Sequence, residues 1–313
     1  MFLHQFLVPK QIANRCGSSD YKITTYSGYD IITTKERMRR DTERSFPPEK
    51  DACKQRLEKC VISISAYGSN PLFWNGAIAN VREAKKVYPG WKVRIYHNSS
   101  IAPEIMAQLR MLDNAELVEE LEIKGGSVAG MFWRFLIADD TSVDRYIVRD
   151  ADSRPSWRER AAVNEWISSG RTFHIMRDNP CHGTQVLGGM WGGLKGGFPF
   201  LVRAAILSEK GRPYLLPAKG SDQDFLTNFL YSTMRNSVMC HDSHLCQVYE
   251  GCQPFPTQNL LPGIFVGFPG IFSFEDLPRG EKDNTTLSQT YTFRAQTCPV
   301  QCRPFQHLNW VYC

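Results

Sequence analysis

The sequence contains no long hydrophobic run. A helix that crosses a bilayer needs about 18 consecutive apolar residues. The longest apolar stretch, Gly263 to Phe272, is shorter and is interrupted by Gly267, Pro269 and Gly270. The opening residues, MFLHQFLVPK, also lack the apolar core of a signal peptide. We therefore expect no transmembrane segment, and either the protein does not use the signal-peptide route or its anchor is absent from this chain.

The sequence also has little excess charge of either sign. The chain has 313 residues, with 37 basic and 32 acidic side chains, and the net charge of +5 is spread along it. Nucleic-acid-binding proteins usually concentrate basic residues on one face, so the composition predicts no nucleic-acid partner. A small positive excess is compatible with an anionic ligand. Hydrophobic residues make up 42%, close to the globular average, which predicts a sizeable core.

The ten cysteines include no C-x-x-C pair, so the usual spacing of a zinc site is missing. An even number of cysteines gathered in one region is typical of disulfides formed in an oxidising compartment. We therefore predict C-terminal disulfides and a secretory-pathway location, in the Golgi lumen, with a cytoplasmic protein as the alternative. Two glycosylation sequons agree with this: Asn98-Ser99-Ser100 and Asn284-Thr285-Thr286. The clustered cysteines are Cys240, Cys246, Cys252, Cys298, Cys302 and Cys313.

Composition divides the chain into three parts. Residues 1–57 are predicted to form a solvated stem, because the stretch from Lys35 to Arg56 is crowded with charges, contains Pro47-Pro48 and has no apolar period. Residues 58–251 form an organised domain. Residues 252–313, rich in proline, glycine, aromatics and cysteine, are predicted to form a tail packed on that domain.

Predicted strands and helices alternate along the organised domain. This order indicates βαβ units and a mainly parallel sheet, whose ligands bind at the carboxyl ends of the strands. The glycine-rich segment 177–197 is predicted to be a loop. The predicted strands are 61–65, 91–96, 116–123, 145–148 and 172–176. The predicted helices are 71–88, 103–112, 128–138, 156–170, 198–208 and 221–234.

The first chemical signal is a pair of aspartates directly after a predicted strand. Asp150 and Asp152 are two residues apart, so their carboxylates can converge on one divalent cation. Mg²⁺ and Mn²⁺ prefer such oxygen ligands and often share them with phosphate. The alternative is an ordinary turn with solvated aspartates.

Two further signals follow along the chain. Asp222-Gln223-Asp224 stands at a predicted helix start, with Ser221 as the N-cap, where the residues can face a ligand or simply favour the helix dipole. His241 follows a short apolar run and can supply a third metal ligand or be a buried structural histidine.

Together these signals resemble the glycosyltransferases of the GT-A fold, most of all the family-8-like, LgtC/glycogenin type, over about residues 60–250. Those enzymes carry a D-x-D at a strand end, a D-Q-D-x-L-N segment and a C-terminal histidine that completes a Mn²⁺ site. The resemblance implies an α/β, Rossmann-like GT-A fold with a mixed, mainly parallel sheet flanked by helices, so that residues 58–251 form the catalytic domain. It also implies transfer of a hexose from a nucleotide sugar, a UDP-sugar, to an acceptor hydroxyl on a glycan, glycoprotein or other molecule.

The resemblance assigns roles to individual residues. The implied ligands of Mn²⁺ or Mg²⁺ are Asp150, Asp152 and His241. Asp222 and Gln223 would contact the transferred sugar, and Asp224 would orient the acceptor or act as base. In the glycine-rich loop, an indole offers a flat apolar face to a sugar and glycine allows close backbone approach. The residues predicted to bind the donor are Ala66, Tyr67, Gly68, Arg134, Asp150, Gly189 and Trp191.

The sequence departs from this family in two places. Thr227 stands before Asn228 where the family has asparagine directly after leucine, and the H-x-x-G-x-x-K-P-W ending is absent after His241. Two alternatives therefore stay open. One is a non-catalytic glycan-binding module on the same fold. The other is a phosphohydrolase of the haloacid-dehalogenase type, in which Arg154 would occupy a place usually held by threonine or valine.

Overall fold

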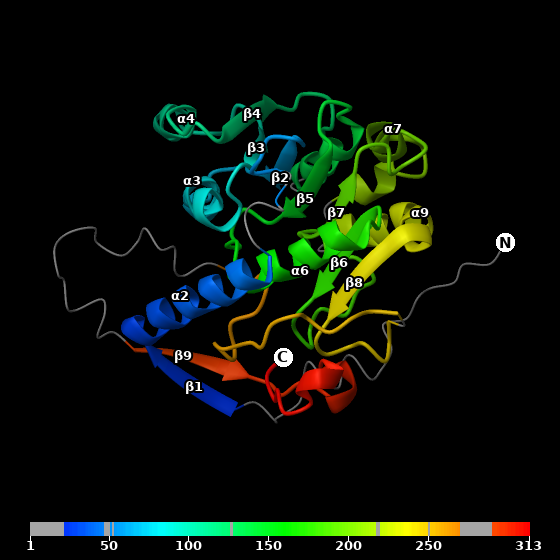
Figure 1. Cartoon of the computed structure of the whole chain (residues 1–313). Coiled ribbons are helices and arrows are strands. Elements are labelled where there is room, and N and C mark those ends of the chain that lie inside the picture. Colours follow the sequence, from blue (N-terminus) through cyan, green and yellow to red (C-terminus); the bar gives the residue numbers. More distant parts are fainter. Residues whose placement is uncertain are drawn as a thin grey trace.

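The computed structural model describes residues 22–46, 51, 53–125, 128–216, 220–249, 251–269 and 290–313. Its centre is a seven-stranded sheet with the order β4-β3-β2-β5-β7-β6-β8 (Figure 1). All neighbouring strands are parallel except where β7 pairs with β5 and β6. The strands are β2 (Cys60–Ser65), β3 (Lys92–His97), β4 (Ala115–Glu119), β5 (Arg145–Arg149), β6 (Phe173–Arg177), β7 (Met190–Leu194) and β8 (Val238–Asp242).

Helices cover both faces of the sheet because successive side chains of a strand point to opposite sides. In β2, Val61 belongs to one hydrophobic cluster, whereas Ile62 and Ile64 belong to the other. The helices in the cluster with Ile62 are α3 (Pro71–Val87), α4 (Pro103–Arg110) and α6 (Trp157–Ser169). Those around Val61 are α5 (Gly130–Trp133), α7 (Val202–Leu207), α8 (Ser221–Phe225), α9 (Tyr231–Met234), the 3₁₀ helices η2 (Arg134–Asp139) and η3 (Arg212–Leu215), and the π-helical turn η4 (Leu226–Leu230).

Local capping explains where two of these helices begin. The Asn70 side chain accepts a hydrogen bond from the Leu72 N–H at the start of α3, and Pro71 occupies its first turn. The Ser156 side chain accepts from the Glu159 N–H at the start of α6, which ends at Gly170 in the left-handed conformation. Among the described helices, none is both long and apolar enough to cross a membrane.

Strand β7 corrects the expectation that residues 177–197 form a loop. A Cβ atom on Gly192 would lie 2.6 Å from the Tyr146 carbonyl oxygen, and one on Gly193 would lie 2.5 Å from the Tyr146 hydroxyl. The glycines are therefore needed where β7 pairs with β5. Their low intrinsic preference for strands hid this element from the sequence pattern.

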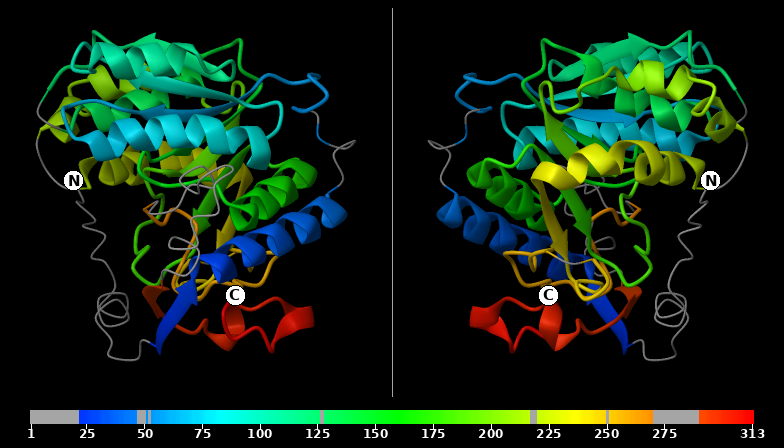
Figure 2. Two further views of the ribbon diagram at one scale, coloured as in Figure 1. Left: turned by 90° about the vertical axis from the view of Figure 1, so that its left-hand side faces the viewer. Right: turned by 90° about the vertical axis from the view of Figure 1, so that its right-hand side faces the viewer.

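Residues 22–46 of the predicted N-terminal stem contain a strand and a helix. Strand β1 (Lys22–Ser27) pairs antiparallel with β9 (Thr290–Ala295), and helix α2 (Gly28–Ser45) runs beside α6 (Figure 2). Ser27 and Asp30 form a capping box at the start of α2. Among the residues of this helix from Asp30 onward, only Ile31 and Thr42 are buried, so its sequence shows no apolar period. Pro47-Pro48 lies outside the described residues.

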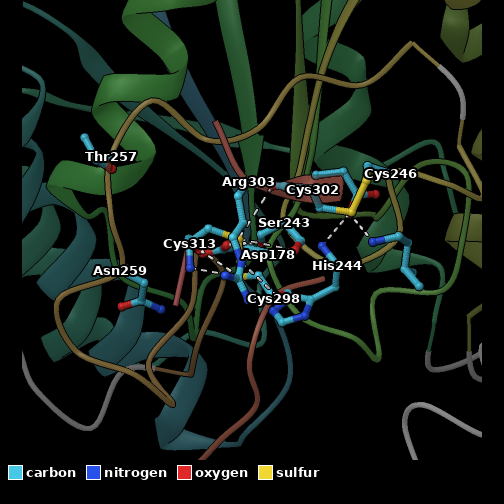
Figure 3. Close-up of a disulfide and its surroundings, with 12 residues drawn as sticks. Asp178, Ser243, His244, Cys246, Thr257, Asn259, Cys298, Cys302, Arg303 and Cys313 are labelled. Atoms are coloured by element: carbon cyan, nitrogen blue, oxygen red, sulfur yellow. Dashed lines mark hydrogen bonds between the residues drawn. A yellow bond between two sulfur atoms is a disulfide. The ribbon is translucent and has the colours of Figure 1, made fainter. Parts of the chain in front are cut away.

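The C-terminal tail is attached to the domain by disulfides and by backbone groups that form hydrogen bonds with a buried ion pair of the domain. Arg158 on α6 bonds Asp178 through two nitrogens and also reaches the backbone oxygen of Cys313. Figure 3 shows this region, with Ser243 and Asp178 beside the tail. The tail also contains the 3₁₀ helices η6 (Val300–Cys302) and η7 (Phe305–His307). The disulfides between cysteines of the described residues are Cys53–Cys60, Cys240–Cys252, Cys246–Cys302 and Cys298–Cys313.

These observations confirm the predicted fold class: a mixed, mainly parallel α/β sheet flanked by helices, with a cysteine-rich C-terminal tail. Cys181 is also disulfide-bonded. The sequon at Asn98 lies in the loop after β3, and the sequon at Asn284 falls outside the described residues.

Candidate functional site

The carboxyl ends of the parallel strands bring polar residues from distant parts of the chain to one edge of the sheet. Tyr67 follows β2, Asp150 follows β5, Asp178 follows β6 and His244 follows β8. The start of the antiparallel strand β7, after Gly189, lies at the same edge because Met190 pairs with Arg149. In sheets of this kind, this is the edge where ligands bind.

Arg134 links two of the predicted motifs at this edge. Its Nη1 pairs with Asp150 Oδ1, and its Nη2 pairs with Asp222 Oδ2 at 2.9 Å. The side chains of Arg134 and Asp222 are 7% and 5% exposed, whereas that of Asp150 is 40% exposed. The Arg134 backbone is fixed to β2, since its N–H donates to Ser65 Oγ and its carbonyl accepts from Ser63 Oγ. Arg134, Asp150 and Asp222 therefore form a cluster that is held in place, and the Asp150 carboxylate is the one open to ligands.

Two glycines make room for this cluster. A Cβ atom on Gly189 would overlap Asp150 Oδ2, and one on Gly188 would overlap Asp222 Oδ2 and crowd Arg134 Nη2. No other residue type leaves this space, so the glycine pair serves the carboxylates as well as the chain turn. Gly189 thus lies at the predicted site, and Gly188 joins it.

The turn from Asp150 to Asp152 is held from below by α3. Ala151 is buried, and its carbonyl accepts a hydrogen bond from Asn80 Nδ2 at 3.1 Å. A Cβ atom on Gly76 would overlap the same carbonyl, so α3 lies directly against the turn. The two partly exposed carboxylates of Asp150 and Asp152 flank this anchored residue. Burial, followed by the neighbouring charge of Asp150, raises the pKa of Asp152.

The crowding of these two carboxylates fits a divalent cation. A cation would relieve the repulsion that raises the pKa of Asp152. Mg²⁺ is commonly held by one or two carboxylates, with phosphate and water completing its ligands. Among the described residues, the one His/Cys/Asp/Glu cluster with metal-like spacing is Cys53, Glu58 and Cys60, whose cysteines form a disulfide. The aspartate pair would therefore take its other ligands from substrate and water.

Tyr67 presents an aromatic ring beside the charged cluster. The ring packs over Gly130, where a Cβ atom would overlap it, and meets Trp133 edge-on at 5.3 Å between centroids. Burial raises the pKa of Tyr67, so its hydroxyl stays protonated at neutral pH. Gly68 turns the chain with φ of +77°, its N–H donating to Ser100 Oγ at 2.8 Å. Ala66 is fully buried and offers no exposed side chain to a ligand.

The start of α8 places its polar residues in three different environments. Gly220, with φ of +84°, is the N-cap, and Ser221 lies inside the helix, contrary to the expected cap. Asp222 is buried against Arg134, Gln223 is half-buried and Asp224 is exposed. Burial raises the pKa of Asp222, and the adjacent Arg134 opposes this.

The structure does not bring His241 to the aspartate pair. Its ring is fully buried, with Nδ1 2.8 Å from His174 Nε2 and Nε2 2.8 Å from Glu165 Oε2. Both ring nitrogens are therefore engaged elsewhere, which corrects the expectation of a third metal ligand. The expectation that Trp191 binds the donor is also wrong. Its indole is fully buried between Phe135 and Tyr146 and cannot stack on a sugar.

His182 is a residue of this edge that the sequence did not single out. Its Nδ1 accepts a hydrogen bond from the Asp178 N–H at 3.0 Å. Burial lowers its pKa to about 4, and the electrostatic neighbours include Asp178, His244 and Asp150. The available signal was position, because Asp178 and His244 directly follow parallel strands and His182 is four residues beyond the first of them.

No protein-family model matches the chain, and no curated protein matches it by sequence. Among solved structures, it is similar to glucosyl-3-phosphoglycerate synthase from Mycobacterium tuberculosis in complex with Mn²⁺, uridine-diphosphate-glucose and phosphoglyceric acid, at 11% identity over 63% of this chain and 74% of that one, with a TM-score of 0.42. It is also similar to 4-diphosphocytidyl-2C-methyl-D-erythritol synthase from Anaerococcus prevotii, at 12% identity over 61% of this chain and 89% of that one, with a TM-score of 0.39. A third similar structure is the glycosyltransferase GlyE from Streptococcus pneumoniae, at 16% identity over 58% of this chain and 45% of that one, with a TM-score of 0.38. Similarity this distant does not identify a function, which therefore rests on the residues of the site.

Proposed function

We propose that the protein is a metal-dependent glycosyltransferase that transfers a hexose from a nucleotide sugar, a UDP-sugar, to an acceptor hydroxyl. The observation that supports this best is the meeting of separate motifs around one guanidinium. The D-x-D segment reaches Arg134 through Asp150, the Asp-Gln-Asp segment reaches it through Asp222, and Gly188-Gly189 makes the space. The cluster lies at the ligand-binding edge of a mainly parallel sheet.

In this proposal the donor lies across the loop after β2 and the D-x-D turn. Asp150 and Asp152 would hold Mn²⁺ or Mg²⁺, which would neutralise negative charge on the departing diphosphate. Tyr67 offers a flat aromatic face beside the cluster for the base of the nucleotide. Arg134 fixes the orientation of the Asp150 carboxylate. Arg134 is therefore a positioning residue, which acts through Asp150.

The α8 residues are assigned to the sugar and the acceptor. Burial raises the pKa of Asp222 and the charge of Arg134 opposes this, and with Gln223 the carboxyl group of Asp222 would bind hydroxyls of the transferred sugar. Asp224 is exposed at the same helix start, where it would receive the proton of the acceptor hydroxyl. The acceptor is proposed to be a hydroxyl of a glycan or glycoprotein.

We also propose that the protein acts in the secretory pathway, in the Golgi lumen. The support is the disulfides that join the tail to the domain, Cys240–Cys252 and Cys246–Cys302, because such bonds persist in oxidising compartments and are rare in the cytosol.

Incubation with a panel of nucleotide sugars tests the proposal. With Mn²⁺ present, one UDP-sugar should release UDP by transfer or slow hydrolysis, and Asp222→Asn should abolish this release. Asp113→Asn is the matched control, because Asp113 is exposed and pairs with Lys85 away from the site. Glycan binding without turnover of any nucleotide sugar would favour the non-catalytic module. Phosphate release from a phosphomonoester would favour the phosphohydrolase.

A further inference from the structure

A second cavity lies away from the strand ends, between α2 and α6. The two helices run side by side (Figure 2), and the tail closes one end of the space with Pro256 and Thr257. Its volume of ≈ 260 Å³ is near the lower limit of about 300 Å³ for small-molecule sites. A ligand of one sugar ring would match this size. The lining residues are Thr42, Ser45, Phe46, Ala161, Asn164, Glu165, Ser168, Pro256 and Thr257.

One wall of the cavity is a single face of α6, because the spacing of Ala161, Asn164, Glu165 and Ser168 is that of residues stacked along a helix. Two of the hydroxyls around it have already used their protons. Thr42 Oγ1 donates to the Trp157 carbonyl, and Ser168 Oγ donates to the Asn164 carbonyl. These oxygens can therefore only accept further hydrogen bonds.

Glu165 supplies the one charge among the lining residues. Its Oε2 accepts a hydrogen bond from His241 Nε2, while its side chain remains 46% exposed. His174 stands behind His241, at 2.8 Å between Nε2 and Nδ1. A carboxylate can only accept, so His241 donates through Nε2 to Glu165. The carboxylate is thus held in place at the cavity wall.

We propose that this cavity is a binding site for a small hydroxylated molecule that carries an ammonium group, with the chemistry of an amino sugar. The fixed carboxylate of Glu165 pairs with the ammonium group, and the hydroxyl oxygens of Thr42 and Ser168 take hydrogen bonds from the O–H groups of the ligand. The ring of Phe46 adds an apolar face. The site is separate from the D-x-D edge and does not depend on the proposed transfer reaction.

Calorimetric titration of the full chain with D-glucosamine tests this site, with D-glucose and n-butylamine as comparison probes. Glucosamine should bind with a dissociation constant of about 1 mM. Glucose lacks the charge, and butylamine lacks the hydroxyls, so each should bind at least about tenfold more weakly. Equal binding of glucose would overturn the role of the carboxylate, and equal binding of butylamine would overturn the amino-sugar chemistry.

Two variants locate the binding. Glu165→Gln keeps an oxygen for His241 but removes the charge, and should weaken glucosamine binding about tenfold. Ser168→Leu should block the cavity if the fold holds. Glu104→Gln, an exposed carboxylate on α4, is the matched control and should bind as the unmodified protein does. Unchanged binding in Glu165→Gln, or competition between glucosamine and UDP, would refute the assignment to this cavity.

Discussion

Replacing Arg134 with methionine tests whether the cluster at the strand ends is the coupled unit that the geometry indicates. The change keeps most of the apolar stem and removes the charge that two carboxylates share. Asp150 is 40% exposed and can turn to water, so losing its pair should cost no more than about 1 kcal/mol. Asp222 is 5% exposed and would be left buried without a partner. Stranding such a charge costs about 3–5 kcal/mol.

The double variant Arg134→Met, Asp222→Asn separates this effect from simple loss of packing. It removes the stranded charge, so most of the 3–5 kcal/mol should return. Urea unfolding at neutral pH measures the four free energies of the unmodified protein, the single variants Arg134→Met and Asp222→Asn, and the double variant. UDP titration should show loss of binding in Arg134→Met and in the double variant. Arg145→Met is the matched control, since Arg145 pairs with Glu58 at the opposite edge and should leave UDP binding unchanged. A loss under about 1 kcal/mol for Arg134→Met, or strictly additive effects, would refute the reasoning.

Three other outcomes follow from the structure. The pKa of His182 is lower in the folded protein than its unfolded value of 6.5. The unfolded chain therefore binds a proton first, and the stability that is present above pH 6.5 is lost as the pH falls toward about 4. The total loss of unfolding free energy is roughly 3 kcal/mol. Urea unfolding across this pH range should show a smaller loss in His182→Asn than in the unmodified protein. Replacing Cys246 and Cys302 by serine should lower the unfolding free energy by about 4 kcal/mol, since the bridge spans 56 residues, with UDP binding retained; unchanged stability would contradict this. Gly189→Ala should displace the Asp150 carboxylate and abolish UDP binding with the fold intact by circular dichroism; normal binding would argue against the cradle.

The parallel core of the fold was predictable because its strands are short apolar runs set between capped helices. In β2 every residue is buried, and the Asn70-Pro71 start of α3 forms as its sequence indicates. Strand β7 was not predictable, since Gly192 and Gly193 are selected by contact with Tyr146 and not by strand preference. Helix α2 was missed because its docking uses so few buried side chains.

The site was partly predictable for a similar reason. Asp150 and Asp152 could be placed at an edge because a strand end fixes where the chain emerges. The link from Arg134 to Asp222 joins residues 88 positions apart and depends on three-dimensional packing. His241 and Trp191 have suitable chemistry but point into the protein, and their burial is decided by Glu165, His174 and the aromatic core. A side chain's direction, unlike its type, is set by tertiary neighbours.

The most direct test of the metal-dependent donor site is calorimetry of UDP binding with Mn²⁺ and with excess chelator. Metal and nucleotide should bind with positive coupling, so that Mn²⁺ tightens UDP binding by about 5–150-fold. Asp152→Asn keeps the shape of the turn, removes one carboxylate charge and should abolish this coupling and the transfer reaction. If UDP binds equally well in chelator, and Asp152→Asn retains full transfer activity, the aspartate pair is an ordinary turn and the proposed mechanism is wrong.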